Sequence, residues 1–105
     1  MDRGHVKLWR KMIDDPIFYK PDHLQLFLYL LLRAAWKKRT YRGVVLKRGE
    51  LSTGRKALAE DLDQKESSIY KRLQYLKDKE YITIKSNNKH SIVSICNYDS
   101  YQPID

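Results

Sequence analysis

The stretch Asp61–Glu80 constrains the fold more than any other part of this 105-residue chain, because its apolar residues recur at helical spacing. Ile69, Leu73 and Leu76 stand at positions i, i+4 and i+7, which predicts a helix with a single apolar stripe. The opposite side of that helix carries hydroxyl, amide, cationic and aromatic groups, at Gln64, Ser67, Ser68, Lys71, Gln74 and Tyr75. Such a face is typical either of an ordinary solvated helix or of a helix that approaches DNA closely.

A shorter helix precedes this one. Ser52 or Thr53 can cap its beginning, and Leu62 ends it. Asp63-Gln64-Lys65 then predicts a tight turn, because aspartate tolerates the left-handed backbone conformation that such turns often require. A short helix, a three-residue turn and a longer helix together predict a helix-turn-helix.

Two apolar runs follow, Tyr81–Lys85 and Ser91–Asn97, in which apolar and polar residues alternate as in half-buried strands. The polar residues 86–90 between them predict the tip of a hairpin. Either Val44–Arg48, which is bracketed by glycines, or Glu50–Ser52 would supply a third strand. A helix-turn-helix followed by a β-hairpin is the order of a winged helix, so the predicted fold class is mostly α with a small antiparallel sheet.

The first third of the chain predicts two more helices. His5–Asp14 has mostly helical apolar spacing and is expected to end before Pro16. Asp22 can cap a second helix, His23–Trp36, whose many leucines leave little polar face, so this helix should lie at the centre of the core. It is too short to span a membrane, which takes roughly 20 residues.

Positive charge is concentrated in one block of the chain. The whole sequence has 21 lysines and arginines against 13 aspartates and glutamates, a net charge of +8. Eight of these basic residues and one acidic residue, Glu50, fall within Lys37–Lys56, so this block alone contributes +7. Such a balance favours a polyanionic partner, and nucleic acid is the commonest one. An acidic membrane surface or an acidic protein would suit the same charge.

These patterns define the candidate DNA contacts. The basic block and the start of the short helix would meet phosphates through Lys37, Lys38, Arg39, Lys47, Arg48, Arg55 and Lys56. The turn and the long helix would face the DNA groove through Gln64, Lys65, Ser67, Ser68, Lys71, Gln74 and Tyr75. The hairpin would either lie along a minor groove or be a solvated tip, with Lys85, Asn87, Asn88 and Lys89 as its polar residues.

Other kinds of site find little support in the sequence. The single cysteine, Cys96, excludes an internal disulfide and a cysteine-based zinc finger, and it fits a reducing cytoplasm. The histidines His5, His23 and His90 are widely separated and lack metal-ligand spacing. Thr53-Gly54-Arg55-Lys56 lacks the phosphate-loop pattern, and no nucleophile and base stand at a suggestive spacing. We therefore expect no enzyme, cofactor or metal, and the first residues form no signal peptide.

Four stretches of the chain have a recognisable character: Gly4–Met12, Leu46–Leu51, Arg55–Ala59 and Asn88–Gln102. In their order and spacing they resemble the N-terminal winged-helix domain of phage replisome organisers and related DnaD-type primosomal proteins. The resemblance implies binding of double-stranded DNA at a replication origin, self-association, and help in recruiting the helicase-loading machinery. Contact with a helicase or helicase loader would come from a C-terminal part outside this chain.

On this resemblance residues 1–102 would form the winged-helix DNA-binding domain, and residues 103–105 would begin a linker. The chain departs from the family pattern at Asp63 and Glu80, where winged helices often have glycine, and at Lys65, where a serine or threonine cap is usual. The expected role is therefore replication initiation in a phage or prophage, in the cytoplasm and away from membranes. Two alternatives remain open: a winged-helix transcriptional regulator, and a protein-interaction module whose basic face docks an acidic partner.

Overall fold

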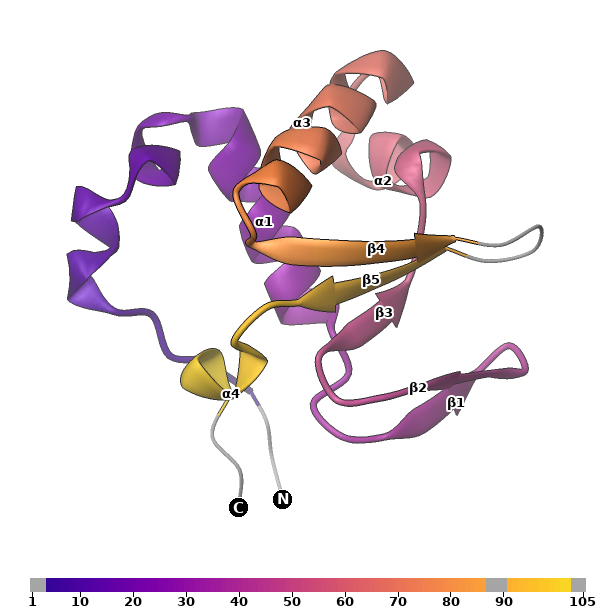
Figure 1. The fold of residues 1–105 in the computed structure, drawn as a ribbon. Coiled ribbons are helices and arrows are strands. Elements are labelled where there is room, and N and C mark those ends of the chain that lie inside the picture. Colours follow the sequence, from indigo (N-terminus) through magenta and orange to yellow (C-terminus); the bar gives the residue numbers. More distant parts are fainter. Residues whose placement is uncertain (1–3, 87–90, 103–105) are drawn as a thin grey trace.

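The computed structural model describes residues 4–86 and 91–102, which combine helices with a small antiparallel sheet. In chain order the elements are η1 (Arg10–Asp14), η2 (Pro16–Tyr19), α1 (Pro21–Arg33), β1 (Arg39–Tyr41), β2 (Val44–Leu46), β3 (Glu50–Ser52), α2 (Arg55–Leu62), α3 (Glu66–Asp78), β4 (Ile82–Ser86), β5 (Ser91–Ile95) and α4 (Tyr98–Tyr101). Helices α1, α2 and α3 share one hydrophobic core with strands β3, β4 and β5 (Figure 1).

The core sheet has the strand order β3-β5-β4, and both pairings are antiparallel. Val93 of the central strand lies opposite Leu51 of β3 and Ile84 of β4, so apolar side chains from all three strands share one face. This register confirms the two predicted apolar runs as a hairpin. It also decides between the two candidate third strands in favour of Glu50–Ser52.

Helix α1 runs through the centre of the molecule, as its leucine-rich sequence predicts. Its side chains Leu26, Phe27, Leu30 and Leu31 are buried, whereas Leu32 is 65% exposed. The predicted bounds are wrong at both ends, because the helix begins at Pro21 and ends at Arg33. Proline suits the first helical turn, since its missing N–H would have no partner there. No helix in the described parts of the chain has the length and apolar character needed to cross a membrane.

Helices α2 and α3 form the predicted helix-turn-helix. Ile69, Leu73 and Leu76 face the core with exposed fractions of 0, 6 and 0%. Asp63 has φ 52° and ψ 52°, the left-handed conformation expected for the turn. Glu80, just after α3, also has a positive φ of 64°. Asp63 and Glu80, where winged helices often have glycine, therefore keep the backbone conformation that glycine adopts most easily.

The predicted cap of α2 is wrong. The residue at the capping position is Gly54, which has an extended backbone and no side chain that could accept a capping hydrogen bond. Ser52 ends strand β3, and the Thr53 backbone N–H donates a hydrogen bond to the Ser91 carbonyl oxygen over 3.1 Å. Both residues are thus part of the sheet.

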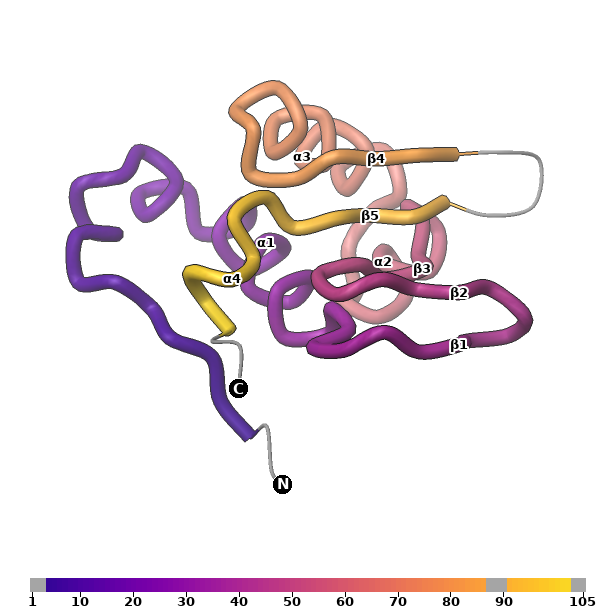
Figure 2. Tube along the Cα trace, turned by 60° about the horizontal axis from the view of Figure 1, so that its bottom comes forward, coloured from indigo at the N-terminus to yellow at the C-terminus, as the bar shows by residue number. Residues whose placement is uncertain are grey.

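An additional hairpin, β1–β2, was not predicted. Tyr41 pairs with Val44, and the two residues between them, Arg42 and Gly43, have φ values of 50° and 79°. Two consecutive positive φ angles are the mark of a tight two-residue hairpin turn. The proposed strand Val44–Arg48 is therefore shorter, Val44–Leu46, and belongs to this second sheet. Figure 2 shows β1 and β2 beside β3, and both hairpins extend toward the same side of the molecule.

Residues 4–20 form an arm, which we call the N-terminal arm. The predicted helix His5–Asp14 is wrong: only Arg10–Asp14 is helical, and it is a 3-10 helix. The Lys7 backbone N–H donates a hydrogen bond to the Tyr101 carbonyl oxygen over 2.7 Å, and Ile17 is buried in the core. The arm is thus fixed at both ends and curves around one side of the fold (Figure 1).

Candidate nucleic-acid interface

A groove runs between α3, the start of α2 and the β4–β5 hairpin. Its volume is about 340 Å³, and we call it the α3 groove. Its wall is formed by Thr53, Gly54, Arg55, Tyr70, Leu73, Gln74, Ile84, Ser86, Ser91 and Val93. The helix-turn-helix and the hairpin therefore meet at one concave surface, with hydroxyl, amide and guanidinium groups above an apolar floor.

Gln74 is the predicted base-reading residue that lies in this groove. Its amide makes no hydrogen bond to another residue in the described part of the chain. Ser67 and Lys71 are exposed on the outer side of the same helix, and Ser68 is half-buried. These four residues keep polar groups available to a ligand that lies along α3.

Two other predicted residues of this face turn toward α1 instead. The Gln64 amide nitrogen donates a hydrogen bond to Gln25 Oε1 over 3.0 Å, and the Gln64 Oε1 accepts one from Arg72. The Tyr75 ring packs edge-on against His23, with 4.7 Å between ring centroids. Gln64 and Tyr75 therefore serve mainly to join α3 to α1.

The contact between α3 and α1 also perturbs an ionisable group. Burial lowers the pKa of His23, and the positive charges of Lys20 and Arg72 lower it further. Arg72 in turn pairs with Asp22 at 3.1 Å. Arg72 was not among the predicted contacts, because Asp22 lies in a helix distant in sequence.

The start of α2 places a cation at the edge of the groove. Arg55 lies 3.2 Å from Glu66 Oε1, and its guanidinium carbon lies 5.2 Å from the Tyr70 ring centroid. Tyr70 is 47% exposed and was missed by the sequence analysis, which grouped residues by their position opposite the apolar stripe. Lys56 and Lys65 are exposed at the two ends of this region.

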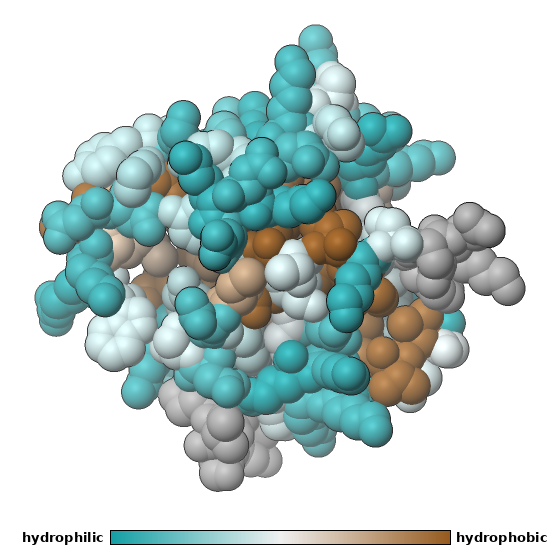
Figure 3. All heavy atoms as spheres, viewed as in Figure 1, coloured by the Kyte–Doolittle hydropathy of each residue, from teal (hydrophilic) through white to brown (hydrophobic). Residues whose placement is uncertain are grey.

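The β1–β2 hairpin and its flanks carry a dense group of positive charges. Lys37, Lys38, Arg39, Arg42 and Lys47 are exposed. The guanidinium carbons of Arg39 and Arg42 lie 5.9 and 5.2 Å from the Tyr41 ring centroid, which spaces these charges around one aromatic ring. On the face drawn in Figure 3, hydrophilic side chains cover α3, and a hydrophobic patch lies toward the β1–β2 hairpin, where Val45 is 55% exposed.

Arg48 differs from its neighbours in the basic block. Its Nε lies 2.7 Å from Asp99 Oδ1, and its other nitrogens donate hydrogen bonds to the carbonyl oxygens of Trp36 and Gln102. Its guanidinium also lies 5.1 Å from the Tyr98 ring centroid. These contacts occupy the group that was predicted to meet phosphate, so we leave Arg48 out of the candidate interface.

Lys85 is the predicted hairpin residue whose position the structure describes; it is exposed and pairs in register with Ile92. Asn87, Asn88 and Lys89 lie outside the described residues. No group of three or more metal-ligating side chains gathers within residues 4–86 and 91–102.

Comparisons with protein-family models, with curated proteins and with solved structures gave no match.

Proposed function

We propose that the chain is a winged-helix domain that binds double-stranded DNA. The observation that carries the proposal is the α3 groove, in which the amide of Gln74, without a hydrogen-bond partner among residues 4–86 and 91–102, lies between a helix-turn-helix and a β-hairpin. A half-buried glutamine whose amide faces such a groove can form paired hydrogen bonds with an adenine edge in the major groove. In this proposal α3 enters the major groove and Ser67 allows the close approach.

The positive charge supports the same proposal from a second direction. Lys37, Lys38, Arg39, Arg42 and Lys47 are exposed on or beside a hairpin that extends to the same side as β4–β5 (Figure 2). Exposed lysine and arginine side chains contact phosphates without reading sequence. The hairpin would therefore supply affinity, while α3 would supply discrimination between sequences.

The more specific role that we propose is replication initiation in a phage or prophage. It rests on the resemblance to replisome organisers, in which such a domain binds origin DNA and helps to recruit the helicase-loading machinery. Selection of bound duplexes from fragments of the source genome tests this role. Enrichment of fragments beside replication genes would support it, and enrichment of promoters would favour a transcriptional regulator.

DNA titration of the domain across a salt series tests the proposed binding itself. We expect Gln74→Ala to cost about 1–3 kcal/mol of binding free energy on the selected duplex and little on a scrambled duplex. Lys7→Ala removes one exposed positive charge from the N-terminal arm, outside the candidate interface, so it controls for a general effect of charge on the titration. It should leave both affinities nearly unchanged.

Two results would contradict the proposal. If the domain binds no duplex at low salt, a protein-interaction module that docks an acidic partner becomes the better explanation. If Gln74→Ala weakens binding to every duplex equally, α3 does not read bases, and the domain is a sequence-neutral clamp.

A further inference from the structure

A second pocket lies between the N-terminal arm and the core, and it shares no lining residue with the α3 groove. Its volume is about 300 Å³, at the small end of the range for ligand pockets, so it suits an occupant about as large as one side chain. The arm contributes Trp9, Asp14 and Asp15, and the core contributes Phe27, Tyr81 and Tyr101.

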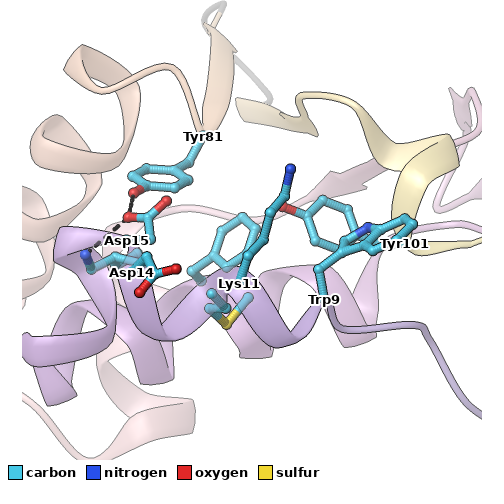
Figure 4. Close-up of a pocket in the computed structure, with 9 residues that line it drawn as sticks. Trp9, Lys11, Asp14, Asp15, Tyr81 and Tyr101 are labelled. Carbon is cyan, nitrogen blue, oxygen red and sulfur yellow. Dashed lines mark hydrogen bonds between the residues drawn. The ribbon is translucent and has the colours of Figure 1, made fainter.

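The two ends of this pocket differ in chemistry. Figure 4 shows Asp14 and Asp15 together at the end where Tyr81 lies, and Trp9 at the end where Tyr101 lies. Phe27 connects the two ends, since its ring centroid lies 5.5 Å from that of Tyr81 and 5.8 Å from that of Tyr101. The pocket is therefore aromatic along its length and acidic at one end.

The acidic end has unused hydrogen-bonding capacity. Asp15 Oδ1 accepts hydrogen bonds from the Ile17 backbone N–H and the Tyr81 hydroxyl. Asp14 makes no hydrogen bond or ion pair with any other described residue. Lys11 also lines the pocket, but its amino group points away from Asp14 (Figure 4).

The neighbouring tyrosines respond to the negative charge. Burial raises the pKa of Tyr101, and the charge of Asp15 raises it further. Burial also raises the pKa of Tyr81, and the hydrogen bond to Asp15 raises it further. A cation placed in the pocket would offset this negative potential.

The N-terminal arm, which forms one wall of the pocket, indicates what kind of molecule would bring the cation. Apolar side chains on the arm are widely exposed, at Leu8, Trp9, Ile13, Phe18 and Tyr19. Exposed apolar residues that gather in one segment are typical of a protein–protein contact surface. A free metabolite would fill the pocket without covering these side chains, whereas a protein would cover them.

We propose that this pocket binds an arginine side chain of a partner protein. The apolar stem would lie toward Trp9 and Tyr101, and the guanidinium would meet Asp14 beside the Tyr81 ring. A flat guanidinium both stacks on aromatic rings and pairs with a carboxylate through two parallel hydrogen bonds, whereas an ammonium presents a compact charge. The pocket and the α3 groove share no lining residue, so the partner and DNA would not compete for the same side chains.

Titration with Nα-acetyl-arginine amide, followed by amide and indole NMR shifts, tests the inference. We expect saturable shifts at Trp9 and Tyr101, with a dissociation constant on the order of millimolar, as is usual for a ligand this small. The citrulline analogue has nearly the same shape without the charge, so it should bind at least about tenfold more weakly.

Two variants locate the site. Asp14→Asn should weaken arginine-amide binding by roughly three- to tenfold, as expected for loss of a partly exposed charged partner. Glu60→Gln removes one exposed negative charge from α2 and should have no such effect. Equal binding of the arginine and citrulline analogues, or equal binding to Asp14→Asn and the parent chain, would overturn the proposal. The readout involves no DNA, so failure of the proposed DNA binding would leave it unaffected.

Discussion

Lys47 and Arg48 are adjacent in the basic block, yet the structure predicts opposite consequences of removing them. Arg48 holds the C-terminal segment through Asp99 and the carbonyl oxygens of Trp36 and Gln102. The pair with exposed Asp99 contributes about 0.2–1 kcal/mol, and a hydrogen bond from a charged donor contributes about 1.5–3 kcal/mol. Since these contributions overlap, we expect Arg48→Ala to lower the free energy of unfolding by about 2–4 kcal/mol.

Lys47 is exposed, and its hydrogen bonds within the described residues come from its backbone: the N–H donates to Glu50 Oε1 over 2.8 Å, and the carbonyl oxygen accepts from the Glu50 N–H over 3.0 Å. Alanine keeps both bonds, so Lys47→Ala should change stability by less than about 0.5 kcal/mol. If Lys47 contacts a phosphate, its removal should lower the slope of log affinity against log salt by about 0.9.

Thermal melting and a salt series of DNA titrations measure both effects on the same two variants. Arg48→Ala should melt on the order of 10 °C below the parent chain, and its salt slope should be unchanged at temperatures where it remains folded. If Arg48→Ala melts like the parent chain and loses salt slope instead, Arg48 acts on DNA rather than on the fold. If Lys47→Ala keeps the full salt slope, Lys47 contacts no phosphate.

Three further predictions concern the fold. Leu76→Ala removes a side chain that is 0% exposed and should cost about 2–5 kcal/mol in urea unfolding; a cost near zero would contradict the core position of α3. Glu80→Gly relieves a positive φ of 64°, so it should raise the free energy of unfolding by up to about 1 kcal/mol and raise the melting temperature accordingly. The folded-state pKa of His23 lies below 6.5, so the unfolded chain binds the proton more tightly. Stability should therefore fall as the pH drops below about 6.5, and His23→Gln should remove that part of the loss.

The helix-turn-helix could be predicted from sequence because its determinants are local. The spacing of Ile69, Leu73 and Leu76 identified the buried stripe, and Asp63 marked a left-handed turn residue. The β1–β2 hairpin could not be predicted in the same way. Its two turn residues are Arg42 and Gly43, and arginine is not a usual residue for a positive φ angle, so the turn lacks the common Asn-Gly or Asp-Gly signal.

The N-terminal arm shows a second limit of sequence patterns. Val6, Trp9 and Ile13 have helical spacing, yet a helix must also be stable against other conformations. Here long-range contacts decide the conformation: the backbone of Lys7 bonds to Tyr101, and Asp15 accepts a hydrogen bond from Tyr81. Partners that lie far away in sequence leave no trace in local periodicity.

The candidate interface divides for a similar physical reason. A helical projection placed Gln64, Gln74 and Tyr75 on one polar face, but it did not show that α1 lies against part of that face. The Gln64 amide and the Tyr75 ring contact residues of α1, whereas Gln74 lines the groove. A polar side chain becomes a candidate contact only when the fold gives it no internal partner.

The location of charge gives the proposed DNA contact its particular form. Helix α3 carries Lys71, Arg72 and Lys77 against Glu66 and Asp78, so its net charge is only +1, and Arg72 is already paired with Asp22. A nearly neutral helix gains little from counterion release, so its binding free energy must come from fit and base hydrogen bonds. The β1–β2 hairpin has the opposite character, with exposed cations in its turn and on its flanks. Salt should therefore weaken binding through the hairpin while the preference between duplex sequences, set at α3, changes much less.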